Sequence, residues 1–467
     1  MMMKNLKQIV TAVFAFTLLL GCESDLNLSP FDSIDAEAAY QNADDLNAGA
    51  LGAYGTISGQ NIYYINALMT DNLRRASSNT GQGMQLFNHN VVSGDGTALG
   101  AWQNAYVAID RINRVIEASN SIEPATNAES DLLNRIRGEM FGLRAWQHFD
   151  LFRIFSSYDL NGNELAVPYM LQSEIGKPAR TTKDEFFNLL LSDIDQAISL
   201  LGPAGFYSNR RLNLHAVEGL RARVAIYRQD WSAAIEYASR VIDALNLTPY
   251  DEYAGLWDDS NQGEVVFKLP RNTASDGVIE LTERATNPDI FFFASNDLVN
   301  QFDTEGDIRF QTWFEILEPG RVRVLKYNQR SGQKNVADIK MLRVSEMYFI
   351  RAEAYAQPGS QQNLETAASD INAIKEVRYQ NPEMVTFSSS EQALAEIHAE
   401  KRLEFVYEGH RYFDLKRAGL PVQRIPDDID GATTSDNLPA NSHMFVFPIP
   451  QAEMFANENM IQNPGYE

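Results

Sequence analysis

Residues 400–417 of this 467-residue chain read EKRLEFVYEGHRYFDLKR and form its most ordered polar stretch. In a helix Glu400, Glu404 and Glu408 share one face, and arginines alternate with them among aromatic side chains. Arginine pairs bidentately with carboxylates where water is scarce. The stretch therefore predicts a salt-bridged helix, part of a helical block at residues 391–416, that packs tightly against its neighbours.

Helical periodicity extends outward from this stretch over most of the chain. It begins near residue 37 and returns over residues 102–116, 132–155 and 183–201. Residues 212–245 and 344–378 each read as two helices, with alanines and aromatics three or four positions apart. Such pairs resemble tetratricopeptide repeats, although ordinary helical hairpins account for the pattern as well. We predict an all-α, mainly helical fold with tetratricopeptide-like helix pairs as its frame.

Two segments interrupt the helical pattern. Residues 59–100 are rich in Gly, Asn and Ser and read as a long loop. Residues 248–340 are mixed, with short apolar runs at 265–267 and 322–327 that look like small strands. Because long irregular segments on a rigid frame are often functional, we predict that these two insertions form the binding face.

The N-terminus has the build of an export signal. An apolar run of about 12 residues follows two lysines, and it is shorter than the roughly 20 residues that cross a bilayer. It ends at Cys22, the only cysteine, in a setting that resembles the lipobox of bacterial lipoproteins. We predict a signal peptide at 1–21, a lipidated tether at 22–36 and a single domain at 37–467. Once Cys22 carries lipid, no thiol remains for disulfides or catalysis.

Charge and motifs exclude several classes of function. The chain has 39 basic and 62 acidic residues, and its net charge of -23 disfavours nucleic acid. Its six histidines form no metal-ligand spacing, and GxSxG, Walker and GxGxxG motifs are absent. The polar runs 159–164 and 303–307 do not complete the ligand alternation of a calcium loop. We therefore expect no catalytic residue, no metal and no cofactor.

Residues 400–417 also carry a family likeness, and six further blocks accompany it in order. The stretch follows the pattern E-R-x-x-E-x-x-x-E-G-x-R-x-x-D-L-x-R at Glu404, Glu408, Gly409, Arg411 and Asp414, with Leu415 and Arg417 completing it. The other blocks are RGEMFGLRAWQHFDLF at 137–152, AVP at 166–168, RTT at 180–182, DIDQA at 193–197, EMYFIRAEAY at 346–355 and NPGY at 463–466. Together they resemble the SusD/RagB family, outer-membrane nutrient-binding lipoproteins of Bacteroidetes.

The resemblance implies a function at the cell surface. It implies a non-catalytic lipoprotein, anchored in the outer membrane and facing the exterior, that captures oligo- or polysaccharide. It also implies delivery of this ligand to a TonB-dependent, SusC-like transporter. Three alternatives remain: a RagB-like member that captures peptides, a lipid-anchored glycosidase, and a helical-repeat adaptor that binds no small ligand.

A sugar ring needs flat aromatic side chains beneath its C–H faces and polar groups beside its hydroxyls. The candidate glycan-binding residues in the two insertions are Tyr63, Tyr64, Asp71, Asn72, Arg74, Trp257, Phe291, Phe292 and Trp313. For each aromatic, a local core beneath a loop accounts for the sequence equally well. Trp102, Trp146 and Trp231 lie on helical patterns and are expected to be packing residues.

Overall fold

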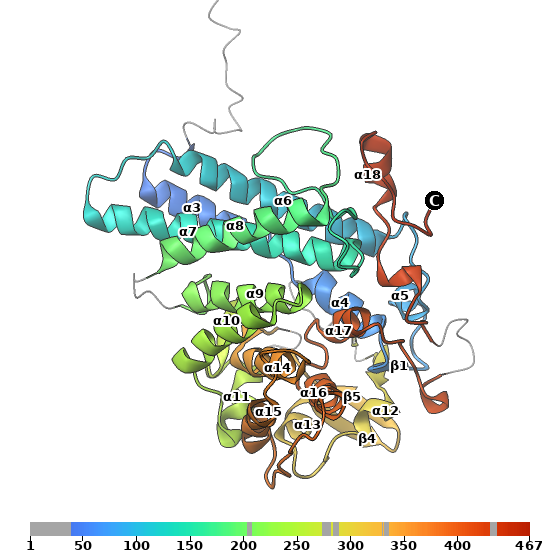
Figure 1. The fold of residues 1–467 in the computed structure, drawn as a ribbon. Coiled ribbons are helices and arrows are strands. Elements are labelled where there is room, and N and C mark those ends of the chain that lie inside the picture. Colours follow the sequence, from blue (N-terminus) through green and yellow to red (C-terminus); the bar gives the residue numbers. More distant parts are fainter. Residues whose placement is uncertain are drawn as a thin grey trace, which may run out of the picture.

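The computed structural model describes residues 39–202, 208–272, 282–283, 289–328, 330, 336–429 and 437–467. Within these residues the fold is mainly helical, and the named strands form three two-stranded antiparallel sheets (Figure 1). The predicted all-α class is therefore confirmed. The predicted signal peptide (1–21) and the whole predicted tether (22–36), Cys22 included, lie outside the described residues.

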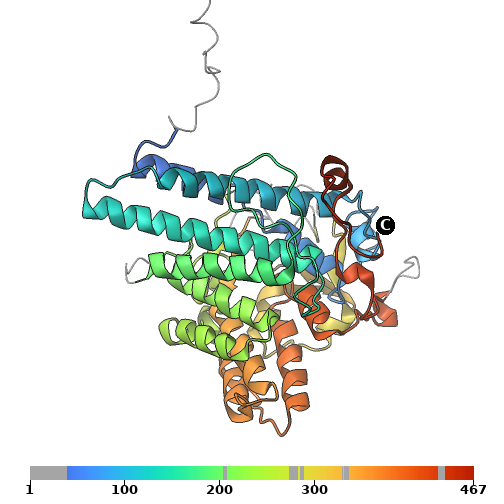
Figure 2. The same ribbon diagram turned by 45° about the horizontal axis from the view of Figure 1, so that its top comes forward.

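Long helices form the upper layer in Figures 1 and 2: α3 (Ala43–Tyr54), α6 (Gly96–Ser119), α7 (Asn127–Phe155) and α8 (Lys183–Leu201). The second half of α7 is buried on all sides. A Cβ on Gly142 of α7 would lie 2.3 Å from Leu212 Cδ2, so only glycine allows this close approach. The family-like block at 137–152 therefore lies at the centre of the helical layer.

Helix pairs extend the frame downward, as predicted. α9 (Leu214–Tyr227) is followed by α10 (Trp231–Ala244), and α14 (Val344–Ala356) by α15 (Leu364–Arg378) and α16 (Ser390–Glu404). Local capping explains where three of them begin: Asn213, Asp230 and Asn363 accept the first free backbone N–H groups of α9, α10 and α15. The two predicted helix pairs are confirmed, while their assignment as tetratricopeptide repeats stays a prediction.

Short elements fill the two insertions. They are α4 (Gln60–Leu68), α5 (Met84–Phe87), α11 (Tyr253–Trp257), α12 (Asn296–Val299) and α13 (Ile308–Trp313), with three short 3-10 helices (Tyr250–Glu252, Pro426–Asp428 and His443–Phe445) in and after them. β1 (Leu73–Arg75) pairs with β3 (Phe292–Ala294), β2 (Val265–Leu269) with β6 (Ile339–Arg343), and β4 (Phe314–Glu318) with β5 (Arg321–Val324). α18 (Gln451–Ala456) ends the series of helices.

Two predicted elements are wrong. Residues 59–100 are not one loop, because α4 buries Tyr63, Ile65 and Leu68 in the core. The helical block at 391–416 is broken between α16 and α17 (Arg411–Ala418). Tyr407 and Gly409 take left-handed φ angles of 60° and 85°, which end the first helix and redirect the chain. His410 therefore precedes α17 and is not part of one continuous helix with Glu404.

Candidate functional site

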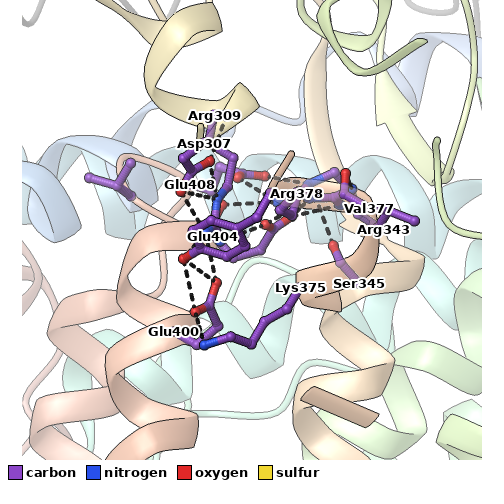
Figure 3. A network of polar contacts seen from close by, with 12 residues as sticks. Asp307, Arg309, Arg343, Ser345, Lys375, Val377, Arg378, Glu400, Glu404 and Glu408 are labelled. Atoms are coloured by element: carbon purple, nitrogen blue, oxygen red, sulfur yellow. Dashed lines mark hydrogen bonds and ion pairs between the residues drawn. The ribbon is translucent and has the colours of Figure 1, made fainter. Parts of the chain in front are cut away.

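The stretch at 400–417 forms a buried network of charges (Figure 3). Glu404 Oε1 accepts hydrogen bonds from Arg343 Nη1 at 2.6 Å and from Arg378 Nη2 at 3.0 Å. Its other oxygen accepts from Arg378 Nε at 3.0 Å and from Arg309 Nη1 at 3.2 Å. Burial alone would raise the pKa of Glu404, but Arg378, Arg343 and Arg309 hold it well below its usual range.

This network joins parts of the chain that are distant in sequence. Arg309 comes from α13, Arg343 from the end of β6 and Arg378 from the end of α15, and all three are fully buried. Glu408 accepts from Arg343 Nε at 2.8 Å and from Lys326 Nζ at 2.6 Å. Every one of these charges has a partner and none faces solvent, so the network fixes the second insertion to the helical frame.

Trp257 and Trp313 were predicted as ligand platforms on loops, and the structure corrects this placement. Each ends a short helix and is fully buried. Their ring centroids are 5.2 Å apart, and Lys326 Nζ lies 3.4 Å from the Trp313 ring and 4.4 Å from the Trp257 ring. The two indoles shield this internal ammonium, so their faces are occupied within the protein.

Most of the other candidate glycan-binding residues are also buried and make their contacts within the protein. Tyr63 is buried on α4 and donates to the Lys340 carbonyl at 2.8 Å. Asp71 and Asn72 are buried; Asp71 pairs with Arg411 at 2.6 Å, and Asn72 accepts from Arg402 Nε at 2.9 Å. Phe291 and Phe292 are buried too, and the Phe292 ring packs 5.3 Å from that of Phe87. The expectation that these side chains are open on a loop is wrong, because β1–β3 pairing and α4 draw them into the core.

Tyr64 and Arg74 differ from the rest because both are partly exposed. The Tyr64 hydroxyl accepts from Gln60 Nε2 at 3.0 Å, one turn earlier on α4. Arg74 lies in β1, opposite Phe293 of β3. The role of these two residues in ligand binding stays a prediction.

Burial does not separate the tryptophans predicted to bind ligand from those predicted to be packing residues. Trp146, expected to be a packing residue, is 1% exposed, and Trp257 and Trp313 are 0% exposed. Trp102 is buried as well, and Trp231 packs at the edge of the core. The position of a tryptophan in a polar, irregular segment of this sequence therefore did not indicate that its side chain is exposed.

An open groove of about 1420 Å³ runs along the outer face of α6. An extended segment, residues 171–178, arches above this helix in Figure 1, and we call it the arch. The groove is lined by Ala39, Tyr40, Trp102, Gln103, Asn104, Tyr106, Val107, Asp110, Arg111, Arg114, Glu117, Ala118, Ser121, Pro168, Met170, Glu174, Ile175, Gly176, Pro178 and Glu453.

Hydrogen bonds hold the arch above α6. Ser173 donates its backbone N–H to Glu117 Oε1 at 2.7 Å and its hydroxyl to Asp110 Oδ1 at 2.6 Å. Beneath the arch, the Tyr106 hydroxyl donates to the Pro168 carbonyl at 2.8 Å, and its ring packs 4.9 Å from that of Trp102. Burial raises the pKa of Tyr106, so this hydroxyl stays protonated. The groove thus combines an aromatic floor with polar walls.

Sequence reasoning missed this groove. Its floor and one wall are the solvent side of a regular amphipathic helix, a pattern that normally indicates nothing beyond solubility. The only available signal was the irregular segment after Pro168, whose polar and glycine-containing sequence indicates a loop.

The two acidic runs considered for calcium have other roles. Lys183 Nζ lies 2.7 Å from both Ser157 Oγ and Glu164 Oε2, so an ammonium fills the oxygen-lined turn at 159–164. In the other run, Asp303 Oδ1 accepts the backbone N–H groups of Glu305 and Gly306. Among the described residues no cluster of His, Cys, Asp or Glu has the arrangement of a metal site. Over the same residues, no helix has the length and apolar character to span a bilayer.

The described chain is a mainly helical protein with a buried ionic network and an open groove. Two family models match it: one described as "SusD family" over residues 296–466, and one described as "Starch-binding associating with outer membrane" over residues 26–226. The chain belongs to the SusD-like family, as its sequence blocks predicted.

Relatives support this assignment over nearly the whole length. SusD-like protein P38 of Formosa agariphila is 23% identical across 99% of both chains. Starch-binding protein SusD of Bacteroides thetaiotaomicron is 32% identical over 148 residues, 30% of this chain and 25% of that protein. A crystal structure of a SusD superfamily protein from the same species superposes with a TM-score of 0.79 at 25% identity, covering 91% of this chain and all of that one.

Proposed function

We propose that this protein is a non-catalytic surface lipoprotein that captures a glycan and delivers it to a TonB-dependent, SusC-like transporter. The single observation that carries the proposal is the open groove along α6, in a chain of the SusD-like family. At about 1420 Å³ the groove exceeds the usual size of a pocket for one small molecule, and it is open enough for an extended ligand.

The lining of the groove suits sugar hydroxyls. Gln103 and Asn104 offer amides that both donate and accept, and Arg111 and Arg114 offer further donors. Tyr40 and Tyr106 provide aromatic surface for C–H faces. Four carboxylates, Asp110, Glu117, Glu174 and Glu453, face two arginines in the lining. This balance favours a neutral sugar chain in the groove over a polyanion.

Attachment to the outer membrane is the second part of the proposal. Acylation of Cys22 after removal of residues 1–21 would anchor the protein, with 22–36 as tether and 37–467 as one domain. The family description, starch binding in association with the outer membrane, supports this location. Cys22→Ala should release the protein from the membrane fraction into the soluble fraction. Unchanged fractionation would contradict the anchor.

Glycan binding is tested by affinity gel electrophoresis of the unlipidated protein against a panel of polysaccharides. The groove variant combines Gln103→Ala with Asn104→Ala, two exposed amides on α6. Its matched control combines Asn188→Ala with Gln196→Ala, two exposed amides on α8. We expect one glycan to retard the protein and its control, and the groove variant to be retarded less.

Two other results would redirect the proposal. If no glycan binds but a peptide pool does, the family stands and the ligand class is peptide, as in the RagB-like alternative. If incubation with the bound glycan produces new reducing ends, the protein is a glycosidase; we expect none.

A further inference from the structure

Arg74 carries a positive charge that no ion pair or hydrogen bond engages within the described residues. It lies in β1, and its guanidinium carbon is 5.3 Å from the ring centroid of Phe293, the residue opposite it in β3. The guanidinium makes no hydrogen bond and no ion pair within the described chain, and its Nε is buried without a partner. Elsewhere in the described structure, buried and partly buried arginines other than Arg221 have hydrogen bonds or ion pairs.

The surroundings of Arg74 disfavour its positive charge. Burial lowers the pKa of Arg74, and the nearby charge of Arg321 lowers it further, while Asp428 acts in the opposite direction. Asp428 attracts Arg74 without forming an ion pair with it, and its oxygens accept the backbone N–H groups of Asn296 at 2.6 Å and Asp297 at 3.1 Å. A partly desolvated cation without a hydrogen-bonded partner is costly, so an anionic ligand would be stabilised here.

Arg74 lies beside an exposed glycine, Gly320, at the surface of the protein. Pro319 and Gly320 form the turn between β4 and β5, and Gly320 has a φ of 75°. A Cβ built on Gly320 would lie 3.8 Å from Asn296 Oδ1 and 3.9 Å from Arg74 Nη2. A guanidinium donor and an amide acceptor therefore both border an exposed backbone position that carries no side chain.

The two groups select a particular ligand chemistry. Guanidinium matches a carboxylate through two parallel hydrogen bonds. Asn296 Nδ2 is engaged with the Asp427 carbonyl at 3.3 Å, which leaves Oδ1 to accept from a hydroxyl. A carboxylate with a hydroxyl beside it is the pattern of an acidic sugar.

We propose that Arg74, Asn296 and the Gly320 turn, together the Arg74 cradle, bind the carboxylate of an acidic sugar. This inference rests on the proposed function, because it assumes that the carboxylate belongs to a glycan. The cradle shares no residue with the groove along α6. It recognises one carboxylate and its neighbouring hydroxyl, which is compatible with a net charge of -23 over the whole chain.

The test uses paired probes that differ only in the carboxylate. Oligogalacturonate and its fully methyl-esterified form are titrated into the unlipidated protein by calorimetry. Arg74→Gln is compared with the protein and with Arg221→Gln, its matched control. Arg221 lies outside both sites, in contact with the Tyr237 ring at 5.4 Å, and like Arg74 has no hydrogen bond or ion pair in the described structure.

We expect methyl esterification and Arg74→Gln each to weaken binding by about tenfold to a hundredfold, as for a charge-assisted hydrogen bond. Arg221→Gln should bind like the parent, and thermal melting should show all three proteins folded. High salt should reduce the preference for the acid. Equal binding of acid and ester, no binding of oligogalacturonate, or no effect of Arg74→Gln would overturn the proposal.

A second pair of probes separates glycan from peptide: an acetylated peptide with a free C-terminal carboxylate and the same peptide as its amide. If only the peptide acid binds through Arg74, the acidic-sugar proposal is overturned, and so is glycan capture. If neutral glycans bind and depend on Gln103 and Asn104 but no acid binds through Arg74, only the cradle is wrong.

Discussion

The Glu404 network and the groove along α6 use the same kinds of side chain with opposite results. In the network, the carboxylate of Glu404 contacts three arginines from three distant elements, and all of these groups are buried. In the groove, Asp110 and Arg114 form an ion pair at 2.9 Å between two solvent-exposed side chains. The difference is in desolvation: buried partners depend on each other, whereas exposed ones are hydrated and remain available to a ligand.

The largest expected loss of stability comes from a substitution in the buried Glu404 network. Glu404→Gln leaves Arg309, Arg343 and Arg378 without their shared counter-charge in the core. We expect a loss of about 5 kcal/mol in the free energy of unfolding, since removing one partner of a buried ion pair is strongly destabilising. Urea unfolding measures it. A loss below about 1 kcal/mol, the range of exposed ion pairs, would show that the network is not a buried one.

The second prediction concerns the tryptophans. Trp257→Ala should reduce stability by about 3–5 kcal/mol, as Trp146→Ala should, because both side chains fill the core. Trp257→Phe should cost much less, since the indole N–H has no hydrogen-bond partner to lose. Thermal unfolding of the three variants checks this. A fully stable Trp257→Ala protein that has lost glycan binding would restore the sequence-based assignment of a ligand platform.

The third prediction concerns the pH dependence of the stability that a second buried ion pair contributes. Arg417 Nη2 lies 2.7 Å from Glu353 Oε2. Burial alone would raise the pKa of Glu353, but Arg417 lowers it from 4.5 to about 2. The carboxylate therefore stabilises the fold fully above about pH 4.5, and this contribution is lost as the pH falls toward 2. The two pKa values correspond to about 3 kcal/mol.

Unfolding is to be measured for the parent and for Glu353→Gln at pH 7 and at pH 3. The stability difference between the two proteins should shrink at the lower pH. A constant difference would mean that this carboxyl keeps an ordinary pKa in the folded protein.

The smallest expected effect on stability belongs to the groove. Gln103→Ala combined with Asn104→Ala should change the free energy of unfolding by less than about 0.5 kcal/mol, as exposed substitutions usually do. The same variant should show the weakened glycan binding expected above. A large loss of stability would place these amides with the structural network and remove the distinction between the two regions.

Sequence patterns predicted the helical frame because the signals that define a helix lie within the helix itself and at its ends. The 3.6-residue spacing of apolar side chains and the capping residues Asn213, Asp230 and Asn363 lie within a few positions of the elements that they define. The break after Glu404 escaped prediction, because left-handed φ angles at Tyr407 and Gly409 interrupt a pattern that still reads as helical.

The binding surfaces were much less accessible to sequence reasoning. Tyr63, Trp257 and Trp313 have the residue types of a sugar platform, but exposure depends on what packs over them, and here α4, β-pairing and Lys326 do so. Arg74 was selected for its type and its segment. Its lack of an ion pair within the described residues depends on tertiary packing, which places the nearby Asp428 against the backbone of Asn296 and Asp297.

By itself the sequence determined the helical class, the order of the helix pairs and the family, because these depend on local periodicity and on blocks of contiguous residues. Tertiary structure alone decided which charges are partners. Glu404 meets Arg309, Arg343 and Arg378 from 95, 61 and 26 positions away. Tertiary structure also decided which surfaces are open, since burial and hollows depend on contacts between distant segments, as where the arch crosses α6.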